Sequence, residues 1–274
     1  MSTAILLTCY NRKKITLRCL TALTQIRKNF DIYLVDDNST DGTFDAVKKL
    51  FPEVNLIKGT GNLFWNRGMH LAWSVASEKN YDFYIWLNDD VLIHEDSFDE
   101  IFECSTLQNH KSIISGIVLN KKTNEVIYGG RDQAKKLLQP NGKLNSITYL
   151  NGNFVLVPRY VYKILGNLDP VFHHDIGDVD YGLRAKQEGI KVLTTRKAVA
   201  HGEANKIKRF RKDNTTLINR FKHLYSPLGS NPNINFYFRK KHYGILNALL
   251  FYVFLHILAV LPDFVAHILF KDKY

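Results

Sequence analysis

The sequence has few cysteines and few prolines for its length. Its 274 residues include seven prolines and three cysteines, Cys9, Cys19 and Cys104. The cysteines are widely spaced, odd in number and without a CxxC pair, so we expect reduced thiols and neither a disulfide framework nor a zinc site. The amino-terminal stretch has no basic leader, and we therefore expect no signal peptide and a cytoplasmic location.

Glycine is absent from the first predicted strand–helix turn, which reads TCYNRKK (8–14). Dinucleotide-binding folds and sugar nucleotidyltransferases need a glycine-rich turn there, so that the backbone can approach phosphates, and both classes are excluded. The sequence also has no GxxxxGK[ST] loop, which excludes P-loop proteins, and no internal repeat. A nucleotide bound by this chain would be held by side chains, with a metal ion neutralising its diphosphate.

Charge is plentiful but unevenly distributed. The formal net charge is +11, and residues 201–243 contain ten Lys or Arg against two acidic residues. This basic segment, at about 206–241, suits nucleic acid, an anionic membrane surface or a phosphorylated substrate, as well as a plain solvated surface. Its basic residues are not interleaved with aromatics along a predicted sheet and match no nucleic-acid-binding motif, so we expect no nucleic-acid partner.

Short apolar runs alternate with helical patterns over the first hundred residues. This alternation is typical of an α/β fold with a mostly parallel sheet flanked by helices. The hydrophobic fraction of 45% is enough for a sizeable core. Predicted strands cover 3–8, 31–36, 54–58, 83–87, 112–119, 126–130, 152–157 and 190–195, and predicted helices cover 13–26, 39–51, 66–78, 158–166 and 178–189.

Polar or glycine-rich residues follow each of the first four predicted strands. They read TCYN (8–11), DDNSTDG (36–42), GTGN (59–62) and NDD (88–90). Ligands of parallel α/β sheets bind at the carboxyl ends of strands, so these turns form the expected site. Mg²⁺ and Mn²⁺ take carboxylate and phosphate oxygens, which an acidic pair after a strand can supply. Taken alone, the pair is also compatible with a polar turn.

Three of these turns carry a family resemblance. TCYNR, VDDNSTDGT and LNDDV, in this order and spacing, resemble the inverting family-two glycosyltransferases of the GT-A fold over about residues 1–205. The resemblance implies a GT-A fold with a nucleotide-binding part at about 1–100 and an acceptor part at about 101–205. It also implies Mn²⁺ or Mg²⁺, a UDP- or dTDP-sugar donor, and transfer of a hexose or deoxyhexose to a saccharide or lipid-linked acceptor in bacterial surface polysaccharide synthesis.

The same resemblance implies roles for single residues. Thr8 and Asp37 would bind the nucleobase, Asp89 would lie near the ribose, and Asp90 would hold the metal. His201, after a later strand, matches a further metal ligand of some members, although a lone histidine is often structural. The implied nucleotide contacts are Thr8, Tyr10, Asp37, Asn66, Arg67 and Asp89.

The third helix departs from the family pattern. Many relatives open it with an Arg–Asn pair, whereas here Trp65 takes the arginine position and Arg67 follows Asn66. Trp65 would shape the base or sugar pocket or be a buried aromatic, and the phosphate-binding residue stays open. The possible donor pocket comprises Gly61, Asn62, Trp65 and Asn88.

An acidic cluster in HHDIGDVDYGLRA (173–185) resembles the E-D-x-D motif that holds the family's catalytic base. Asp178 aligns with the base and Asp180 with its acidic neighbour, while Gly177 replaces the glutamate. A carboxylate at a helix start is stabilised as an anion, yet it can accept a proton from an acceptor hydroxyl. Asp178 as a simple helix cap, and Asp175 as the base, are the alternatives.

Residues 206–274 are expected to form a basic and apolar helical tail. Its apolar run at 245–261 would span about 26 Å as a helix, which is short for a bilayer crossing. The alternatives are a membrane crossing, a helix in the membrane interface, a homodimer contact, or packing onto the catalytic domain. The adjacent RKK (239–241) suits an anionic surface, so we expect peripheral binding to the inner face of the cell membrane through 239–270.

Two other functions remain as alternatives at this stage. A nucleic-acid-binding protein would use the basic 206–241 segment, and a steep salt dependence would reveal it. A non-catalytic relative would keep the fold without the chemistry, although the presence of Asp89, Asp90 and Asp178 argues against it.

Overall fold

The computed structural model describes residues 1–26, 30–204 and 209–270. They divide into two compact units. The sheet unit comprises Met1–Pro170 and Gly177–Ala204, and the C-terminal unit comprises Val171–Ile176 and the described residues from 209 onward. Val171–Ile176 thus belongs to the second unit, although it lies within the 1–205 range that the sequence assigned to the first. Residues 206–208 of the basic segment lie outside the described residues.

The sheet unit contains one large sheet in the order β3-β2-β1-β4-β10-β6-β11-β5, with β7 on the side of β6. The first four of these strands are parallel, as expected from the alternating pattern, whereas β10 runs antiparallel to both β4 and β6. The second half of the sheet is therefore mixed. The strands are β1 (Thr3–Cys9), β2 (Asp31–Asp36), β3 (Asn55–Lys58), β4 (Phe83–Leu87), β5 (Leu92–Ile93), β6 (Ile113–Asn120), β7 (Val126–Tyr128), β10 (Phe154–Pro158) and β11 (Val192–Gly202), with β8 (Gly130–Arg131) and β9 (Tyr149–Leu150) forming a small separate sheet.

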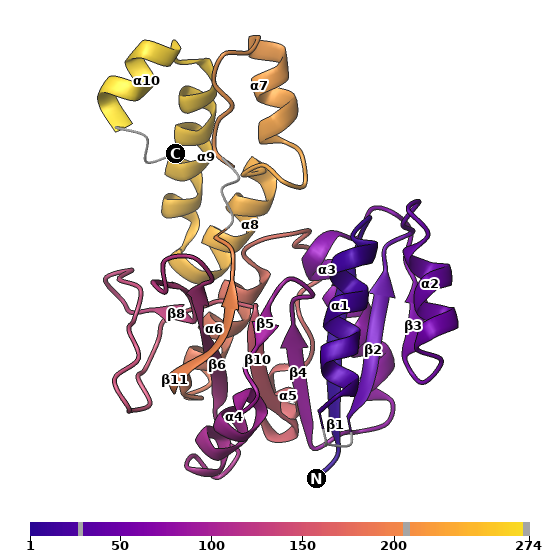
Figure 1. The fold of residues 1–274 in the computed structure, drawn as a ribbon. Helices are drawn as coiled ribbons and strands as arrows, with labels where there is room; N and C mark the ends of the chain where they lie inside the picture. Colours follow the sequence, from indigo (N-terminus) through magenta and orange to yellow (C-terminus); the bar gives the residue numbers. More distant parts are fainter. Residues whose placement is uncertain (27–29, 205–208, 271–274) are drawn as a thin grey trace. The chain divides into compact units, whose positions relative to one another are not determined.

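Helices cover both faces of the large sheet (Figure 1). Because side chains alternate along a strand, Ile5 and Leu7 of β1 pack toward α1 and α4, and Ala4 and Leu6 pack toward α3 and α6. This burial on both faces explains the continuous apolar character of the central strands. The helices are α1 (Lys13–Thr24), α2 (Thr43–Leu50), α3 (Phe64–Ser77), α4 (Ser97–Thr106), α5 (Arg159–Leu165) and α6 (Gly177–Gln187).

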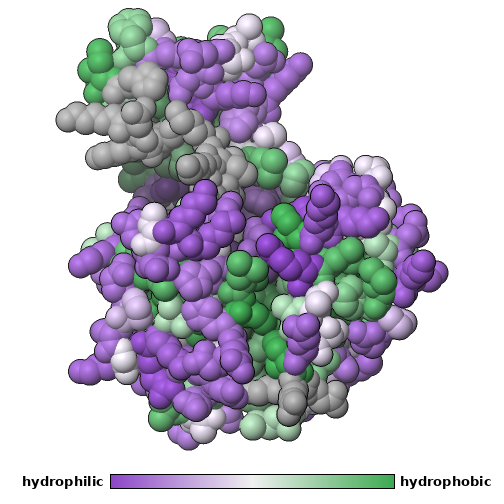
Figure 2. Space-filling view, in the orientation of Figure 1, coloured by the Kyte–Doolittle hydropathy of each residue, from purple (hydrophilic) through white to green (hydrophobic). Residues whose placement is uncertain are grey.

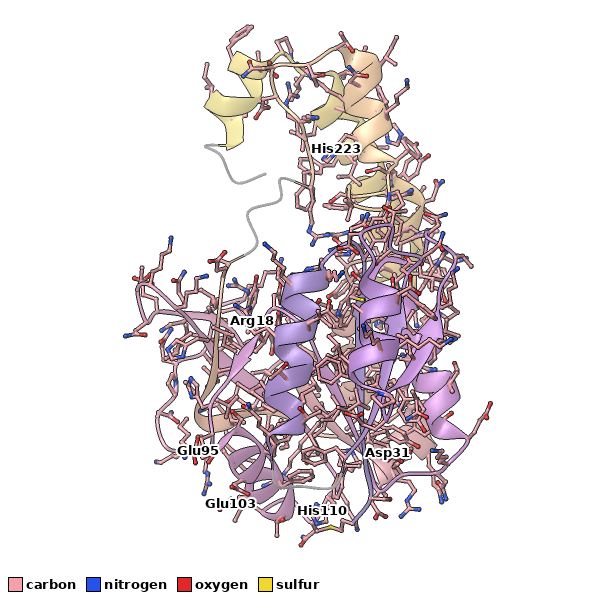
Figure 3. All side chains as sticks on the ribbon, turned by 45° about the vertical axis from the view of Figure 1, so that its right-hand side comes forward. Arg18, Asp31, Glu95, Glu103, His110 and His223 are labelled. Carbon is pink, nitrogen blue, oxygen red and sulfur yellow. The ribbon has the colours of Figure 1, made fainter. Side chains whose placement is uncertain are left out.

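The C-terminal unit is helical, as predicted, and comprises α7 (Leu217–Leu224), α8 (Pro232–Tyr243), α9 (Ile245–Val260) and α10 (Asp263–Phe270). Figure 3 labels His223 on α7. Two arginines fix the end of α9, because Arg211 and Arg220 both donate to the carbonyl of Leu261 at 2.8 Å and both pair with Asp263. Within the described part of the chain, no helix has the length and apolar character needed to cross a bilayer.

Helix α3 approaches β1 very closely near the carboxyl end of that strand. A Cβ atom at Gly68 would lie 2.2 Å from Oγ1 and 2.9 Å from Cβ of Thr8. Only glycine fits this contact without displacing the strand or the helix. The start of α3 is thereby held at the sheet edge where β1, β2 and β4 end.

We predict that Gly68→Ala destabilises the protein by about 1–3 kcal/mol, because the added methyl group overlaps Thr8. Urea denaturation followed by circular dichroism measures the change. Gly202→Ala is a matched control, since the nearest atom to its new Cβ is a side-chain carbon of Val118 at 3.3 Å. Equal stabilities for the two variants would contradict the close packing of α3 on β1.

Candidate active site

Two turns at the carboxyl end of the sheet are tied together by hydrogen bonds. The Asn11 side chain accepts from the Thr40 amide at 2.7 Å, and the Asn11 amide donates to Ser39 Oγ at 2.8 Å. The Lys13 amide donates to Asp41 Oδ2 at 2.9 Å. These contacts join the β1–α1 turn to the β2–α2 turn, so the backbone on either side of Arg12 is fixed.

The acidic pair after β4 is bound by Arg12. Its guanidinium lies 2.9 Å from Asp89 Oδ1 and 2.7 Å from Asp90 Oδ2, and Thr16 donates to Asp89 Oδ2 at 2.8 Å. Burial raises the pKa of Asp89 to about 6, even though Arg12 and Thr16 both favour its charged form. The side chain of Asp89 is 1% exposed and that of Asp90 is 47% exposed. Asp90 is therefore the member of the pair that solvent can reach.

The chemistry of this pair fits a hard divalent cation. Asp90 offers a half-exposed carboxylate, and Mg²⁺ or Mn²⁺ commonly takes one or two protein carboxylates together with phosphate oxygens. Residues 1–26, 30–204 and 209–270 contain no group of three or more His, Cys, Asp or Glu side chains that could hold a metal by themselves. A metal at Asp90 would thus take most of its ligands from substrate and water.

His201 lies at the end of β11, beside β5. Its Nδ1 is 2.8 Å from His94 Nε2, and its Nε2 is 3.2 Å from Asn124 Oδ1. Burial and the neighbouring His201 lower the pKa of His94. Both nitrogens of His201 have protein partners in this arrangement, and its predicted role as a metal ligand would require one of them to be released.

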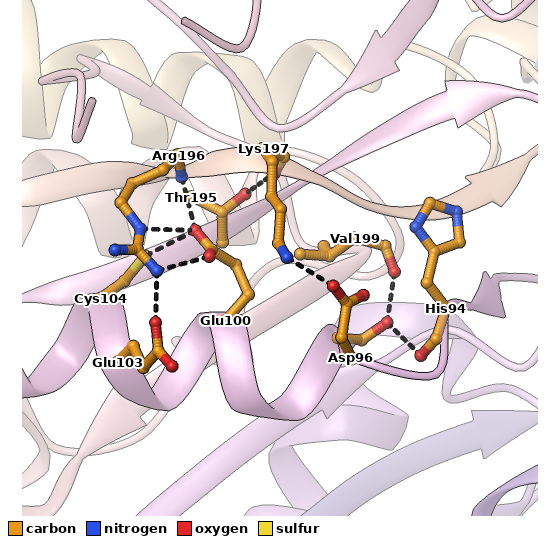
Figure 4. A network of polar contacts seen from close by, with 10 residues as sticks. His94, Asp96, Glu100, Glu103, Cys104, Thr195, Arg196, Lys197 and Val199 are labelled. Atoms are coloured by element: carbon orange, nitrogen blue, oxygen red, sulfur yellow. Dashed lines mark hydrogen bonds and ion pairs between the residues drawn. The ribbon is translucent and has the colours of Figure 1, made fainter. Parts of the chain in front are cut away.

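A polar network on α4 fixes the strand that carries His201 (Figure 4). Arg196 lies 2.7 Å from Glu100 and also pairs with Glu103, while Lys197 pairs with Asp96. In Figure 3 Glu103 is labelled on the exposed side of α4. The buried carboxylate of Glu100 has a lowered pKa, because hydrogen bonds from Arg196 and Cys104 outweigh the effect of burial. The network is structural and holds β11 against α4.

Asp37 organises the loop that precedes α3. Its Oδ1 accepts from the Gly61 amide at 2.7 Å, and its Oδ2 accepts from the amides of Leu63 at 2.8 Å and Phe64 at 3.2 Å. The loop folds so tightly that a Cβ at Gly59 would lie 2.7 Å from Asp37 Oδ1. Asp37, which is predicted to bind a nucleobase, stabilises this loop in the structure. Of the other residues predicted there, Tyr10 and Asn62 are exposed and Thr8 lies against α3.

Trp65 and Asn88 belong to a chain of amide hydrogen bonds. Trp65 Nε1 donates to Asn88 Oδ1 at 2.7 Å, and Asn88 Nδ2 donates to Asn153 Oδ1 at 2.8 Å. Asn153 in turn donates to the Asn151 side chain. This network joins the start of α3 and the turn after β4 to the loop before β10, which the sequence patterns did not single out.

Asp178 lies beside this network at the start of α6. Its Oδ2 accepts from the Gly152 amide at 2.9 Å, and its Oδ1 accepts from the Val179 amide at 2.8 Å. A Cβ at Gly152 would lie 2.5 Å from the Trp65 ring and 3.4 Å from Asp178 Cβ. The predicted base and Trp65 thus both lie close to the point that a side chain at Gly152 would occupy.

The other two acids of the cluster are held in ion pairs. Asp180 is fully buried and lies 2.9 Å from Arg184 Nε, whose guanidinium also binds the carbonyl oxygens of Leu165 and Asn167. Asp175 belongs to the C-terminal unit and lies 3.0 Å from Arg209. This geometry gives Asp180 a structural contact at α6, which leaves Asp178 as the acid of this helix closest to Trp65.

The sheet unit matches a known family. The family model "Glycosyl transferase family 2" matches residues 4–164, more than half of the chain. The chain belongs to glycosyl transferase family 2. A comparison with curated proteins finds no significant match.

Solved structures support the GT-A fold of this family member. Residues 1–349 of Staphylococcus aureus TarS have 14% identity and a TM-score of 0.59, with 100% of this chain and 73% of that chain covered. The mannosyltransferase PcManGT from Pyrobaculum calidifontis, solved with GDP-Man and Mn²⁺, has 17% identity and a TM-score of 0.57 over 99% of this chain and 75% of its own. GalNAc-T7, solved with UDP, GalNAc and Mn²⁺, has 15% identity and a TM-score of 0.59 over 88% and 54%.

The structure explains why this family-two chain has glycine where the resemblance expects glutamate. A Cβ at Gly177 would lie 1.7 Å from Oδ1 of Asn66, so no side chain fits there. Asn66 is buried and donates to the carbonyl of Asp169 at 2.8 Å, and Arg67 donates to that of Pro170 at 2.8 Å. Asn66 and Arg67, which are both predicted to contact the nucleotide, therefore join α3 to the segment that precedes α6.

Several contacts at the site were missed by sequence reasoning. Arg12 and Thr16 bind the acidic pair, and Asn151, Gly152 and Asn153 support Asn88 and Asp178. The R of TCYNR was part of a recognised motif, so Arg12 could have been considered. The NGN loop gave no signal, because its partners are brought together only by the antiparallel insertion of β10.

We predict that Gly177→Ala costs about 2 kcal/mol of stability, because its methyl group displaces Asn66 from Asp169. Removing the obstructing side chain tests this reason directly. In an Asn66→Ala background the same substitution should cost much less, and a double-mutant cycle measured by urea denaturation gives the coupling. Additive effects would contradict a direct collision between residues 66 and 177.

Proposed function

We propose that this protein is a metal-dependent inverting glycosyltransferase that moves a hexose or deoxyhexose from a UDP- or dTDP-sugar to a hydroxyl of a saccharide or lipid-linked acceptor. The observation that carries the proposal is that the sheet unit of this family-two member contains both a half-exposed Asp90 and an Asp178 whose carboxylate accepts from two backbone amides. Its cellular role would be bacterial surface polysaccharide synthesis in the cytoplasm.

The donor and the metal are supported by the related structures. TarS has been solved with UDP-GlcNAc and PcManGT with GDP-Man and Mn²⁺, so a nucleotide-sugar donor and Mn²⁺ or Mg²⁺ are the natural candidates here. Asp90 would hold the ion, with His201 as a further ligand if it leaves His94 or Asn124. A bound divalent ion would stabilise the negative charge that develops on the leaving diphosphate.

Asp178 would act as general base. Its carboxylate takes the proton of the acceptor hydroxyl while that oxygen bonds to the anomeric carbon of the donor sugar. The bond from this carbon to the diphosphate oxygen breaks on the opposite face, so the configuration inverts and the nucleoside diphosphate leaves. The amides of Gly152 and Val179 hold the carboxylate in place, and Trp65 provides an apolar surface beside it on which a sugar ring could stack.

We predict that Asp178→Asn lowers transfer by about 100-fold or more, because the side-chain amide cannot accept the hydroxyl proton. It should cost only about 1 kcal/mol of stability, because the NH2 group can no longer accept from one of the two backbone amides. Sugar transfer is measured by release of nucleoside diphosphate, and donor binding by calorimetry. Asp180→Asn is the matched control on the same helix. It should lower stability by about 3 kcal/mol, since it breaks the buried pair with Arg184. Normal turnover by the Asp178→Asn variant would exclude Asp178 as the base. Binding of the protein to RNA without any need for the sugar donor would favour the nucleic-acid alternative.

We further propose that the C-terminal unit binds the anionic inner face of the membrane. Exposed apolar residues of α9 recur every three or four positions, at Leu246, Leu250, Val253, Ile257 and Val260, and so form one stripe. The opposite side of α9 is buried within the unit through Ala248, Leu255, Leu258 and Ala259.

Basic and apolar residues continue on either side of this stripe. Lys240 and Lys241 are exposed in the last turn of α8, immediately before α9. Exposed Phe264, Ile268 and Leu269 of α10 add hydrophobic surface. Figure 2 shows hydrophobic residues in green where Figure 1 places α10. Cations beside an exposed apolar stripe are typical of helices that lie in the interface of an anionic bilayer.

We predict that the protein co-sediments with vesicles containing phosphatidylglycerol and much less with pure phosphatidylcholine. Leu246→Glu with Leu250→Glu should weaken binding by more than roughly tenfold, since two apolar side chains no longer enter the bilayer. Lys240→Glu with Lys241→Glu should remove the part of the vesicle binding that depends on salt concentration. Leu107→Glu, at an exposed leucine of the sheet unit, is the control and should have no effect. Vesicle binding that is unchanged in the Leu246→Glu and Leu250→Glu variant would contradict the membrane role. So would a dimer, detected by sedimentation velocity, that dissociates when these two substitutions are made.

A further inference from the structure

We propose that Arg12 is an internal cation that competes with the divalent metal for Asp90 and stays bound to Asp89 when the metal enters. The inference rests on the proposed metal site. Its basis is the guanidinium that bridges both carboxylates, 2.9 Å from Asp89 Oδ1 and 2.7 Å from Asp90 Oδ2. Arg12 would thus set the affinity of the site for metal without being a ligand.

The position of Arg12 is preorganised. Its carbonyl accepts from the amides of Ile15 and Thr16 at 2.9 Å, which begins α1, and the neighbouring Asn11 and Lys13 are bound to the β2–α2 turn. A side chain that starts from a fixed backbone loses less conformational entropy when it binds. The bridge is therefore a feature of the folded edge of the sheet.

The two carboxylates differ in how completely they are held. Asp89 is 1% exposed, with Oδ1 on Arg12 and Oδ2 on the buried Thr16 hydroxyl. Asp90 is 47% exposed, and Arg12 is the one partner that the structure gives its carboxylate among the described residues. A buried carboxylate needs a permanent counter-charge, whereas an exposed one can exchange its partner. Arg12 is therefore expected to keep Asp89 and release Asp90.

The exchange of partners at Asp90 affects how strongly the site binds metal with and without the sugar donor. Without metal and donor, Arg12 neutralises the pair and prevents two adjacent carboxylates from repelling each other. When the ion binds Asp90 together with a diphosphate, Arg12 remains next to the site as a second positive charge. In the absence of donor, the affinity for metal is then lower than it would be if Asp89 and Asp90 had no arginine beside them.

The test is the affinity for Mn²⁺ measured by calorimetry without donor or acceptor. Arg12→Gln should bind Mn²⁺ roughly tenfold more tightly than the unmodified protein, because a positive charge a few ångströms from the ion is removed. Lys13→Gln removes a neighbouring charge that touches neither carboxylate, and should change the affinity less than about threefold. Arg12→Lys keeps the charge but lacks the planar donor fork of arginine, and its Mn²⁺ affinity should lie between those of the unmodified protein and Arg12→Gln.

Further variants keep the inference falsifiable. If Arg12→Gln does not fold because Asp89 is left without a counter-ion, Arg12→Gln with Asp89→Asn removes that buried charge and should still bind Mn²⁺ at Asp90. Equal Mn²⁺ affinity in the unmodified protein and in the Arg12 variants, with binding lost in Asp90→Asn, would overturn the role of Arg12 and leave the metal site intact. If Asp90→Asn leaves Mn²⁺ binding unchanged, the metal does not bind at Asp90. That result would overturn both the proposed metal site and the proposed competition with Arg12.

Discussion

Negative charge at the carboxyl edge of the sheet is the constraint on which the rest of this structure depends. Asp36–Asp37 lie at the end of β2 and Asp89–Asp90 follow the end of β4, and folding brings these four carboxylates to the same edge of the sheet. A buried carboxylate is costly unless it is paired or hydrogen-bonded. The fold resolves this in two ways, with backbone amides around Asp37 and with Arg12 and Thr16 around Asp89.

These two solutions shape the site differently. Amide donors are fixed in the backbone, so Asp37 determines the path of the loop at 59–64 and the start of α3. The Arg12 guanidinium belongs to a side chain and not to the backbone, and we expect that the charge it provides at the half-exposed Asp90 can be replaced by another cation. Asp37 is therefore a fixed structural part of its loop, whereas Asp90 stays accessible to solvent. That division follows from burial, since Asp37 and Asp89 are buried and Asp90 is half exposed.

Much of this arrangement could be predicted from the sequence, because it depends on local patterns. The continuous apolar runs of β1, β2 and β4 and the polar residues after them are sufficient to place a site at the sheet edge, and the family match confirms the resemblance carried by the three turns. Contacts set by long-range topology could not be predicted. The hydrogen bond from Asn88 to Asn153 spans 65 positions, and it exists because β10 runs antiparallel beside β4. The replacement of glutamate by Gly177 was also unexplained until the proximity of Asn66 was known.

Two backbone amides of the sheet unit hold Asp178, even though the residues just before Gly177 do not belong to that unit. The chain leaves the sheet unit after Pro170 and returns at Gly177, one residue before the proposed base. Ile176, the last residue of that excursion, has a φ of +71°, which is strained for a β-branched side chain. Asp178 is nevertheless held by amides of Gly152 and Val179, which both lie in the sheet unit. These two hydrogen bonds place the carboxylate next to the loop at 151–153, whose Asn153 side chain binds Asn88.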